Sequence, residues 1–149
     1  MIGMTKQSGF TLMESLVALI VLSIGMLGIA ALYLESMKAG RTALARSQAV
    51  TLAADMADRI RANATAGAAY AGPGGFGAPP CVAGGVDCTP AQMAAEDVQL
   101  WLNNITASLP NGAGAIIFNN ALNPPQYTIT VSWVEPGEGN VNYVLQVQI

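Results

Sequence analysis

Apolar residues are concentrated near the start of the chain. Residues 15–34 read SLVALIVLSIGMLGIAALYL, twenty residues without a charge, and Glu14 and Glu35 flank this apolar run. A helix of that length, at about 1.5 Å per residue, spans roughly 30 Å, the hydrocarbon thickness of a bilayer. The run therefore predicts a transmembrane helix. A cleaved secretory signal peptide is the alternative, and it fits less well because its apolar part is about 7–15 residues long.

The helical pattern continues beyond the apolar run. Between the run and residue 62 there is no proline and a single glycine, Gly40. Apolar residues recur there at spacings of four, three, four and four, which place them on one face of a helix. They are Ala45, Ala49, Leu52, Met56 and Ile60. We therefore expect one long N-terminal helix over 10–62, transmembrane over about 15–34 and amphipathic over 35–62.

The composition changes after this helix. Residues 63–88 are rich in Gly, Ala and Pro, which predicts a loop without helix or strand. Helical signals return at Thr89, because Thr89, Pro90 and Gln92 have the spacing of a capping box with proline at the first helical position. This start predicts a helix over about 90–109. Its apolar face comprises Val98, Trp101, Leu102, Ile105 and Leu109.

The C-terminal part alternates between apolar and polar residues, as half-buried strands do. Residues 115–118 form a short apolar candidate strand, and 127–133 and 141–149 alternate regularly. Residues 135–140, EPGEGN, separate the latter two by a turn-rich stretch of hairpin length. The predicted fold class is α+β, with the long helix packed on a small antiparallel sheet of about three strands, in a head over 63–149.

Charged residues are scarce and unevenly distributed. They make up 10% of the chain against 52% hydrophobic residues, and the mean hydropathy is +0.43; ordinary soluble domains carry about 25% charged residues. All six Lys and Arg lie at or before Arg61, and the five charged residues after it are acids. The simplest interpretation is a solvated acidic head. This balance is not typical of a nucleic-acid-binding protein, and we expect no nucleic acid contact.

The reactive side chains argue against an enzyme. Without His and with scattered acids, no nucleophile–base pair can be assembled, and we expect neither a catalytic residue nor a cofactor. Cys81 and Cys88 alone cannot complete a zinc site, so no metal is expected. In a translocated domain they should oxidise to a disulfide. Closing a loop of about eight residues would stabilise the fold by roughly 2.5 kcal/mol.

The junction before the apolar run carries the most specific pattern. It reads GFTLME from Gly9 to Glu14, after a short leader whose one basic side chain is Lys6. A basic leader favours keeping that end in the cytoplasm. An acid is costly inside a bilayer, by about 2.5 kcal/mol or more at its centre. Glu14 could simply lie at headgroup depth, where it favours the helix N-terminus.

This junction, together with the apolar run, resembles the class III signal of type IV pilins and type II secretion pseudopilins. The resemblance covers residues 6–34 and implies a leader over 1–9. It implies that a prepilin peptidase cleaves between Gly9 and Phe10 and N-methylates Phe10. It also implies a single-pass bacterial inner-membrane protein with a cytoplasmic N-terminus and a periplasmic head, which later enters a pilus at the cell surface. Its partners would be other major and minor pilins.

Cleavage would give Glu14 a physical role in subunit assembly. The new α-amine at Phe10 is positive and lies beside an apolar segment. Glu14 of a neighbouring, staggered subunit could neutralise that amine, and each charge is tolerable in an apolar setting only when paired. Small residues would allow the helices to approach closely. They are Ala18, Gly25, Gly28, Ala30 and Ala31.

Two short segments of the sequence are similar to PilV-type minor pilins. They read SIGMLGIAALYLES over 23–36 and ITVSWVE over 129–135. Two departures from major pilins agree with a minor role. The apolar run lacks the proline that is usual in major pilins, and both cysteines precede the predicted sheet. The resemblance thus implies a minor pilin that serves in pilus biogenesis, in a priming or tip complex. A minor pseudopilin of type II secretion and a membrane-anchored binding protein outside any filament are the alternatives.

Overall fold

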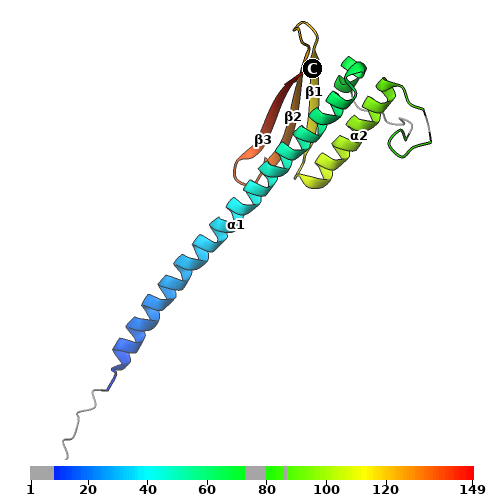
Figure 1. The fold of residues 1–149 in the computed structure, drawn as a ribbon. Coiled ribbons are helices and arrows are strands. Elements are labelled where there is room, and N and C mark those ends of the chain that lie inside the picture. The colour runs from blue at the N-terminus through cyan, green and yellow to red at the C-terminus, as the bar shows by residue number, and fades with distance from the viewer. Residues whose placement is uncertain (1–8, 73–79, 86) are drawn as a thin grey trace, which may run out of the picture. The chain divides into compact units, whose positions relative to one another are not determined.

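The computed structural model describes residues 9–72, 80–85 and 87–149. Three helical elements precede three strands (Figure 1). They are α1 (Leu12–Ala62), the 3₁₀ helix η1 (Ala64–Ala71), α2 (Pro90–Ser108), β1 (Ala113–Asn119), β2 (Gln126–Glu135) and β3 (Gly139–Gln148). The chain divides into two compact units, Met1–Arg41 and Thr42–Ile149. We call them the N-terminal unit and the head.

The N-terminal unit consists of the first part of α1 and the residues before it. The helix begins at Leu12 rather than at the predicted Phe10. Thr11 explains this start, because its carbonyl accepts the N–H groups of Glu14 and Ser15 at 3.1 and 3.2 Å, as an N-cap residue does. Every described side chain from Gly9 to Arg41 is exposed. By length and composition, α1 is able to cross a membrane.

The head contains a three-stranded antiparallel sheet in the order β1–β2–β3. Its register aligns Ile116 with Ile129 and Ile129 with Leu145. Along the central strand β2 every second residue is buried, which confirms the predicted alternation. The first strand is longer than the predicted 115–118.

The core of the head lies between the sheet, α2 and the part of α1 that belongs to the head. The predicted stripe is confirmed at Ala49, Met56 and Ile60, which are fully buried, and Ala53 and Ala57 extend it. Ala45 and Leu52 are only partly buried. Because alanines dominate this stripe, neighbouring elements approach the backbone of α1 closely. The indole Nε1 of Trp101 in α2 donates a hydrogen bond to the carbonyl of Leu52 at 2.8 Å.

The α2 helix forms as its sequence predicts. Thr89 accepts the Gln92 N–H, and the Gln92 side chain accepts the Thr89 N–H, which confirms the capping box. At the other end, Gly112 lies so close to α2 that a Cβ atom would be 2.6 Å from the Ile105 carbonyl. A residue without a side chain is therefore required where the chain turns into β1.

The prediction that residues 63–88 hold no helix was wrong for η1. This stretch is mostly alanine, which suits a helix, and Gly67 at φ 52° allows the kink inside it. Tyr70 is fully buried and anchors η1 in the core, a contact that composition alone does not indicate. Residues 73–79 and 86 of the predicted loop, and 1–8 of the predicted leader, lie outside the described residues.

Candidate functional site

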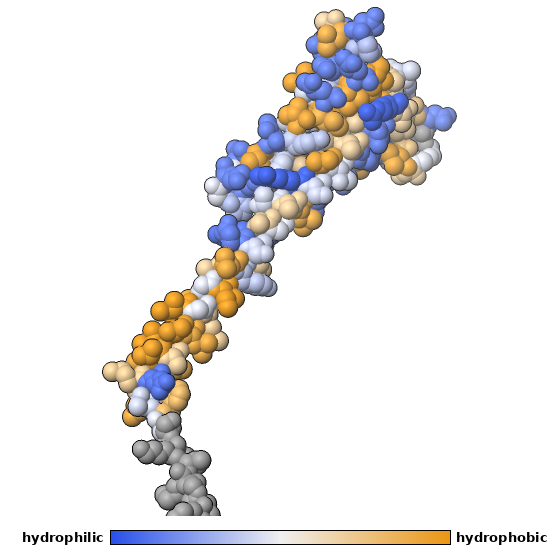
Figure 2. All heavy atoms as spheres, turned by 60° about the vertical axis from the view of Figure 1, so that its left-hand side comes forward, coloured by the Kyte–Doolittle hydropathy of each residue, from blue (hydrophilic) through white to orange (hydrophobic). Residues whose placement is uncertain are grey.

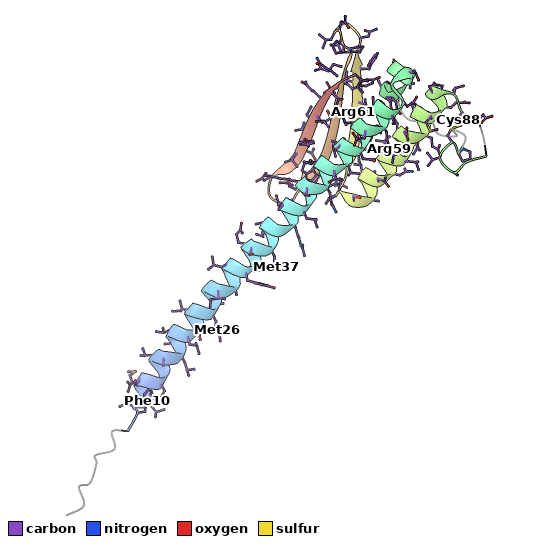
Figure 3. All side chains as sticks on the ribbon, viewed as in Figure 1. Phe10, Met26, Met37, Arg59, Arg61 and Cys88 are labelled. Carbon is purple, nitrogen blue, oxygen red and sulfur yellow. A yellow bond between two sulfur atoms is a disulfide. The ribbon has the colours of Figure 1, made fainter. Side chains whose placement is uncertain are left out.

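The predicted cleavage position lies immediately before α1. Gly9 and Phe10 are exposed and precede the first helical residue, and the Phe10 side chain is 73% exposed (Figure 3). A Cβ atom at Gly9 would meet nothing within 4 Å. The peptide bond between them is therefore non-helical, and no described part of the chain covers it, which is the condition a peptidase needs.

Glu14 lies in the first turn of α1, one turn after Phe10 in sequence. Its N–H donates to the Thr11 carbonyl at 3.1 Å and lies 3.4 Å from the Thr11 hydroxyl. Its carboxylate is exposed, and it forms no ion pair with any described residue. The acid is thus positioned at the helix start with its charge available to a group outside the described chain.

A buried polar cluster in the head was missed by the sequence reasoning. Arg59 donates to Asp97 at 2.8 Å and to Asp55 at 3.0 Å. Tyr70 donates to the second oxygen of Asp97 at 2.9 Å. Asn63 donates to Tyr70 at 3.3 Å and to the Pro90 carbonyl at 2.8 Å. These contacts join the end of α1 to η1 and α2.

The setting of this cluster changes how its members titrate. Burial raises the pKa of Tyr70 to about 12, and its hydrogen bond to Asp97 acts in the same direction, while the Asn63 contact opposes it. Burial disfavours the Arg59 charge, yet hydrogen bonds to Asp97 and Asp55 outweigh it and raise the pKa of the guanidinium. Tyr70 therefore stays neutral and Arg59 charged across the physiological range.

A second cluster ties α1 to the hairpin of β2 and β3. Arg46 reaches both oxygens of Glu135, at 3.0 and 2.9 Å, and Glu138 at 3.2 Å. The Trp133 indole donates to Glu135 at 3.2 Å. The hydrogen bond with Arg46 is the main cause that lowers the pKa of Glu135. Glu135 is thus held ionised although its residue is only 2% exposed.

These clusters correct the interpretation of a solvated acidic head. Asp97 and Glu135 are buried and paired with cations of α1, and Glu138 shares Arg46. Two sequence signals could have found them. Asp97 lies on the apolar face of α2, next to Val98, and Glu135 occupies the next inward position after Trp133 in the β2 alternation. A lone acid on a buried face requires a buried partner.

The predicted disulfide between Cys81 and Cys88 is confirmed, with a Cα–Cα distance of 5.9 Å. It closes a loop directly before α2 (Figure 3), where the Val82 N–H also donates to Glu96 at 2.8 Å. In the described part of the chain, no three His, Cys, Asp or Glu side chains come together as a metal site would require. The polar groups of the two clusters described above hydrogen-bond to one another and connect α1, η1, α2 and the β2–β3 hairpin of the head.

Two family models match adjoining segments of the chain. Residues 4–30 match the prokaryotic N-terminal methylation motif. Residues 31–99 match the family described as Tt1218-like, type IV pilin Tt1218. No curated protein matches the chain, and no solved structure does. The chain thus joins a segment that matches the methylation motif to one that matches a type IV pilin family, and its long helix with a three-stranded antiparallel sheet agrees with the type IV pilin fold.

Proposed function

We propose that this chain is a minor pilin, a structural subunit that assembles into a type IV pilus within a priming or tip complex. The observation that carries the proposal is the junction from Gly9 to Glu14, which is exposed at the start of α1 and leads into the uncharged run 15–34. The matched methylation motif covers this junction. The chain acts as a substrate of prepilin peptidase and as a building block, and it catalyses no reaction.

Processing at Gly9 and Phe10 is the first step of this proposal. In the membrane-inserted precursor, the leader with Lys6 stays in the cytoplasm and the head is periplasmic. Peptidase cleavage frees the Phe10 amine, which is then methylated. A disulfide in the head supports an oxidising compartment on that side of the membrane. Mass analysis of the chain recovered from sheared filaments should find a mature N-terminus at methylated Phe10.

The Gly9→Val variant tests the cleavage position. Because the space around Gly9 is open, the added side chain disturbs no contact of the described chain, so any loss reports on the peptidase. We expect the variant to accumulate with its leader attached. Gly40→Val is the matched control, since Gly40 is equally open, and it should be processed normally. A mature N-terminus at Met1, or after Ala30 or Ala31, in the unaltered chain would exclude this processing and favour a simple anchored protein.

Glu14 is assigned the pairing of subunits. When processed helices lie side by side in a filament, its carboxylate neutralises the Phe10 amine of a neighbour and sets their register. Glu14→Val should be inserted and cleaved normally but should not enter filaments. Glu35→Val, which removes the acid at the other end of the apolar run, is the control and should still enter. Normal incorporation of Glu14→Val would exclude the pairing role.

The assignment as a minor pilin of a type IV pilus, rather than a major pilin or a pseudopilin of type II secretion, is based on two features. The uncharged run contains no proline, and the Cys81–Cys88 disulfide precedes α2 instead of closing a C-terminal loop. Deletion of the gene tests the assignment. Loss of surface pili with intact protein secretion is expected for a minor pilin. Retention of secreted enzymes in the periplasm would instead identify a pseudopilin of type II secretion.

A further inference from the structure

One face of α1 changes from apolar to basic directly after the uncharged run. Leu34, Met37, Lys38 and Arg41 line a shallow hollow of about 210 Å³ within the N-terminal unit. Their spacing of three, four and seven residues from Leu34 places them on one side of the helix. Met37, which Figure 3 labels on α1, precedes Lys38 in the sequence and is 45% exposed. The hollow thus has an apolar wall nearer the run and two cations beyond it.

The depth of these residues corresponds to the polar zone of a bilayer. If the run 15–34 spans the hydrocarbon core, Lys38 lies about 6 Å and Arg41 about 10 Å beyond its end. The headgroup zone extends about 5–7 Å on each side of that core. Side chains of a helix point toward its N-terminus, so both cations reach back toward the membrane. Their charged ends therefore lie at the level of the lipid phosphates.

The charges of these two residues are not used within the described chain. Arg41 forms no ion pair with any described residue. Among the described residues, Lys38 forms an ion pair only with Glu35, at 3.9 Å, and the two side chains are 73% and 77% exposed, so this pair is weak. The guanidinium of an arginine matches phosphate geometry with two parallel hydrogen bonds. Lys38 and Arg41 thus offer a phosphate a partly open pair of donors.

The side of the membrane makes these cations unusual. In the orientation proposed above, Lys38 and Arg41 follow the span on the periplasmic side, whereas Lys6 is the one basic side chain before it. Basic residues near a span normally favour the cytoplasmic side. The two cations therefore oppose the orientation of the chain, and an interaction on the periplasmic side would compensate for that cost.

We propose that Lys38 and Arg41, with Leu34 and Met37 as the apolar wall, bind the headgroup phosphate of an anionic phospholipid in the outer leaflet of the inner membrane. The bound lipid holds the subunit at a defined depth before assembly, with Glu14 at the opposite surface. The inference rests on the membrane anchoring in the proposed function, and it adds a lipid site that this function does not require.

Spin-label spectroscopy of the full chain in bilayer nanodiscs tests the site. The bilayer contains phosphatidylcholine and phosphatidylglycerol, and trace spin-labelled forms of each report how strongly the chain immobilises them. The unaltered chain should prefer phosphatidylglycerol. Lys38→Gln and Arg41→Gln should each lower that preference about fivefold, the effect of one cation near an anionic surface. The double variant should approach equal binding of both lipids, and high salt should act similarly.

Two further variants make the test specific. Arg61→Gln removes an exposed cation of the head that lies 20 positions after Arg41 in the sequence, and it should leave the preference unchanged. Glu35→Gln removes the one acid that contacts Lys38, and it should raise the preference. An equal loss in Arg61→Gln would show that only net charge matters and would overturn the site.

The remaining outcomes separate this inference from the proposed function. If the chain inserts into nanodiscs but shows no preference for phosphatidylglycerol, the lipid site is excluded and the pilin proposal stands. If the chain does not insert into the nanodiscs, it is not a membrane-anchored protein, and both the lipid site and the proposed pilin function are excluded. If the double variant keeps its lipid preference but no longer enters filaments, the two cations bind an acidic protein partner instead, and the lipid site is excluded.

Discussion

The two units of this chain place their apolar side chains in opposite ways. From Gly9 to Arg41 every side chain is exposed, including large ones such as Leu12 and Leu32 at 91% and 74%. In the head, Trp101, Tyr70 and Met56 are fully buried. In the view of Figure 2, hydrophobic side chains predominate on the part of α1 in the N-terminal unit, with hydrophilic spheres at its start, while hydrophilic side chains are frequent on the head. The head thus supplies its own core, and the N-terminal unit needs lipid or neighbouring helices.

The charged residues follow the same division. In the described part of the N-terminal unit, Glu14 is exposed before the apolar run, and Glu35, Lys38 and Arg41 are exposed after it. In the head, Asp97 and Glu135 are buried and satisfied by Arg59, Arg46 and their neighbours. The head therefore uses charge to connect its own elements, whereas the described charges of the N-terminal unit are exposed and form at most the weak pair of Glu35 and Lys38. Substitutions of the same kind should have different effects in the two units.

Truncation of a large apolar side chain should give the largest difference between the two units in the loss of unfolding free energy. Trp101→Ala removes a buried ring and its hydrogen bond to Leu52, and it should lower the free energy of unfolding by about 4 kcal/mol. Met26→Ala, at a side chain 63% exposed, should change it by less than about 0.5 kcal/mol. Urea titration of the full chain in detergent micelles, followed by tryptophan fluorescence, measures both, and Trp133 still reports in Trp101→Ala. Similar losses would contradict the division into two units.

Removal of an acid should separate buried from exposed ion pairs within the head. Asp97→Ala leaves Arg59 and Tyr70 without their shared partner, and it should lower the free energy of unfolding by about 3 kcal/mol. Asp58→Ala breaks an exposed pair with Arg61 and should cost less than about 1 kcal/mol. The same titration measures both variants. A small effect of Asp97→Ala would show that the buried cluster is dispensable.

Addition of one methyl group to a glycine should give a smaller difference in unfolding free energy between the two units. At Gly114 a Cβ atom would lie 2.5 Å from the ring of Trp101 and 2.7 Å from Ile105, so Gly114→Ala should lower the free energy of unfolding by about 2 kcal/mol. Gly25→Ala meets nothing within 4 Å and should leave stability unchanged. Unchanged stability of Gly25→Ala together with reduced entry into filaments would place Gly25 against a neighbouring helix.

Alkaline pH should weaken the head gradually. The pKa of Tyr70 is about 12 in the folded chain against 10.0 for a free tyrosine, so between these values the unfolded chain has lost a proton that the folded chain retains. The free energy of unfolding should therefore fall as the pH rises from about 10 to 12. Tyr70→Phe should show a smaller slope in that window; an equal slope would assign the effect to other groups. Urea titrations at several pH values between about 10 and 12 measure this pH dependence for both chains.

Local patterns determined much of this protein from the sequence alone. The predicted helix over the uncharged run, the strand alternation and the capping box of α2 are confirmed, because each depends on residues a few positions apart. The signal at Gly9 to Glu14 is likewise a local motif, and a family model matches it. A peptidase and a bilayer both recognise short contiguous segments, so a local sequence motif is enough to propose processing and membrane anchoring.

The interior of the head was decided by the tertiary structure. Arg59 and Asp97 are 38 positions apart, and Arg46 and Glu135 are 89 apart, so no local spacing joins them. The η1 helix forms where composition indicated a loop, because Tyr70 gains burial and hydrogen bonds that only the assembled core provides. An acid on an apolar face indicates that a buried partner must exist. Which cation fills that place depends on how α1, α2 and the sheet pack.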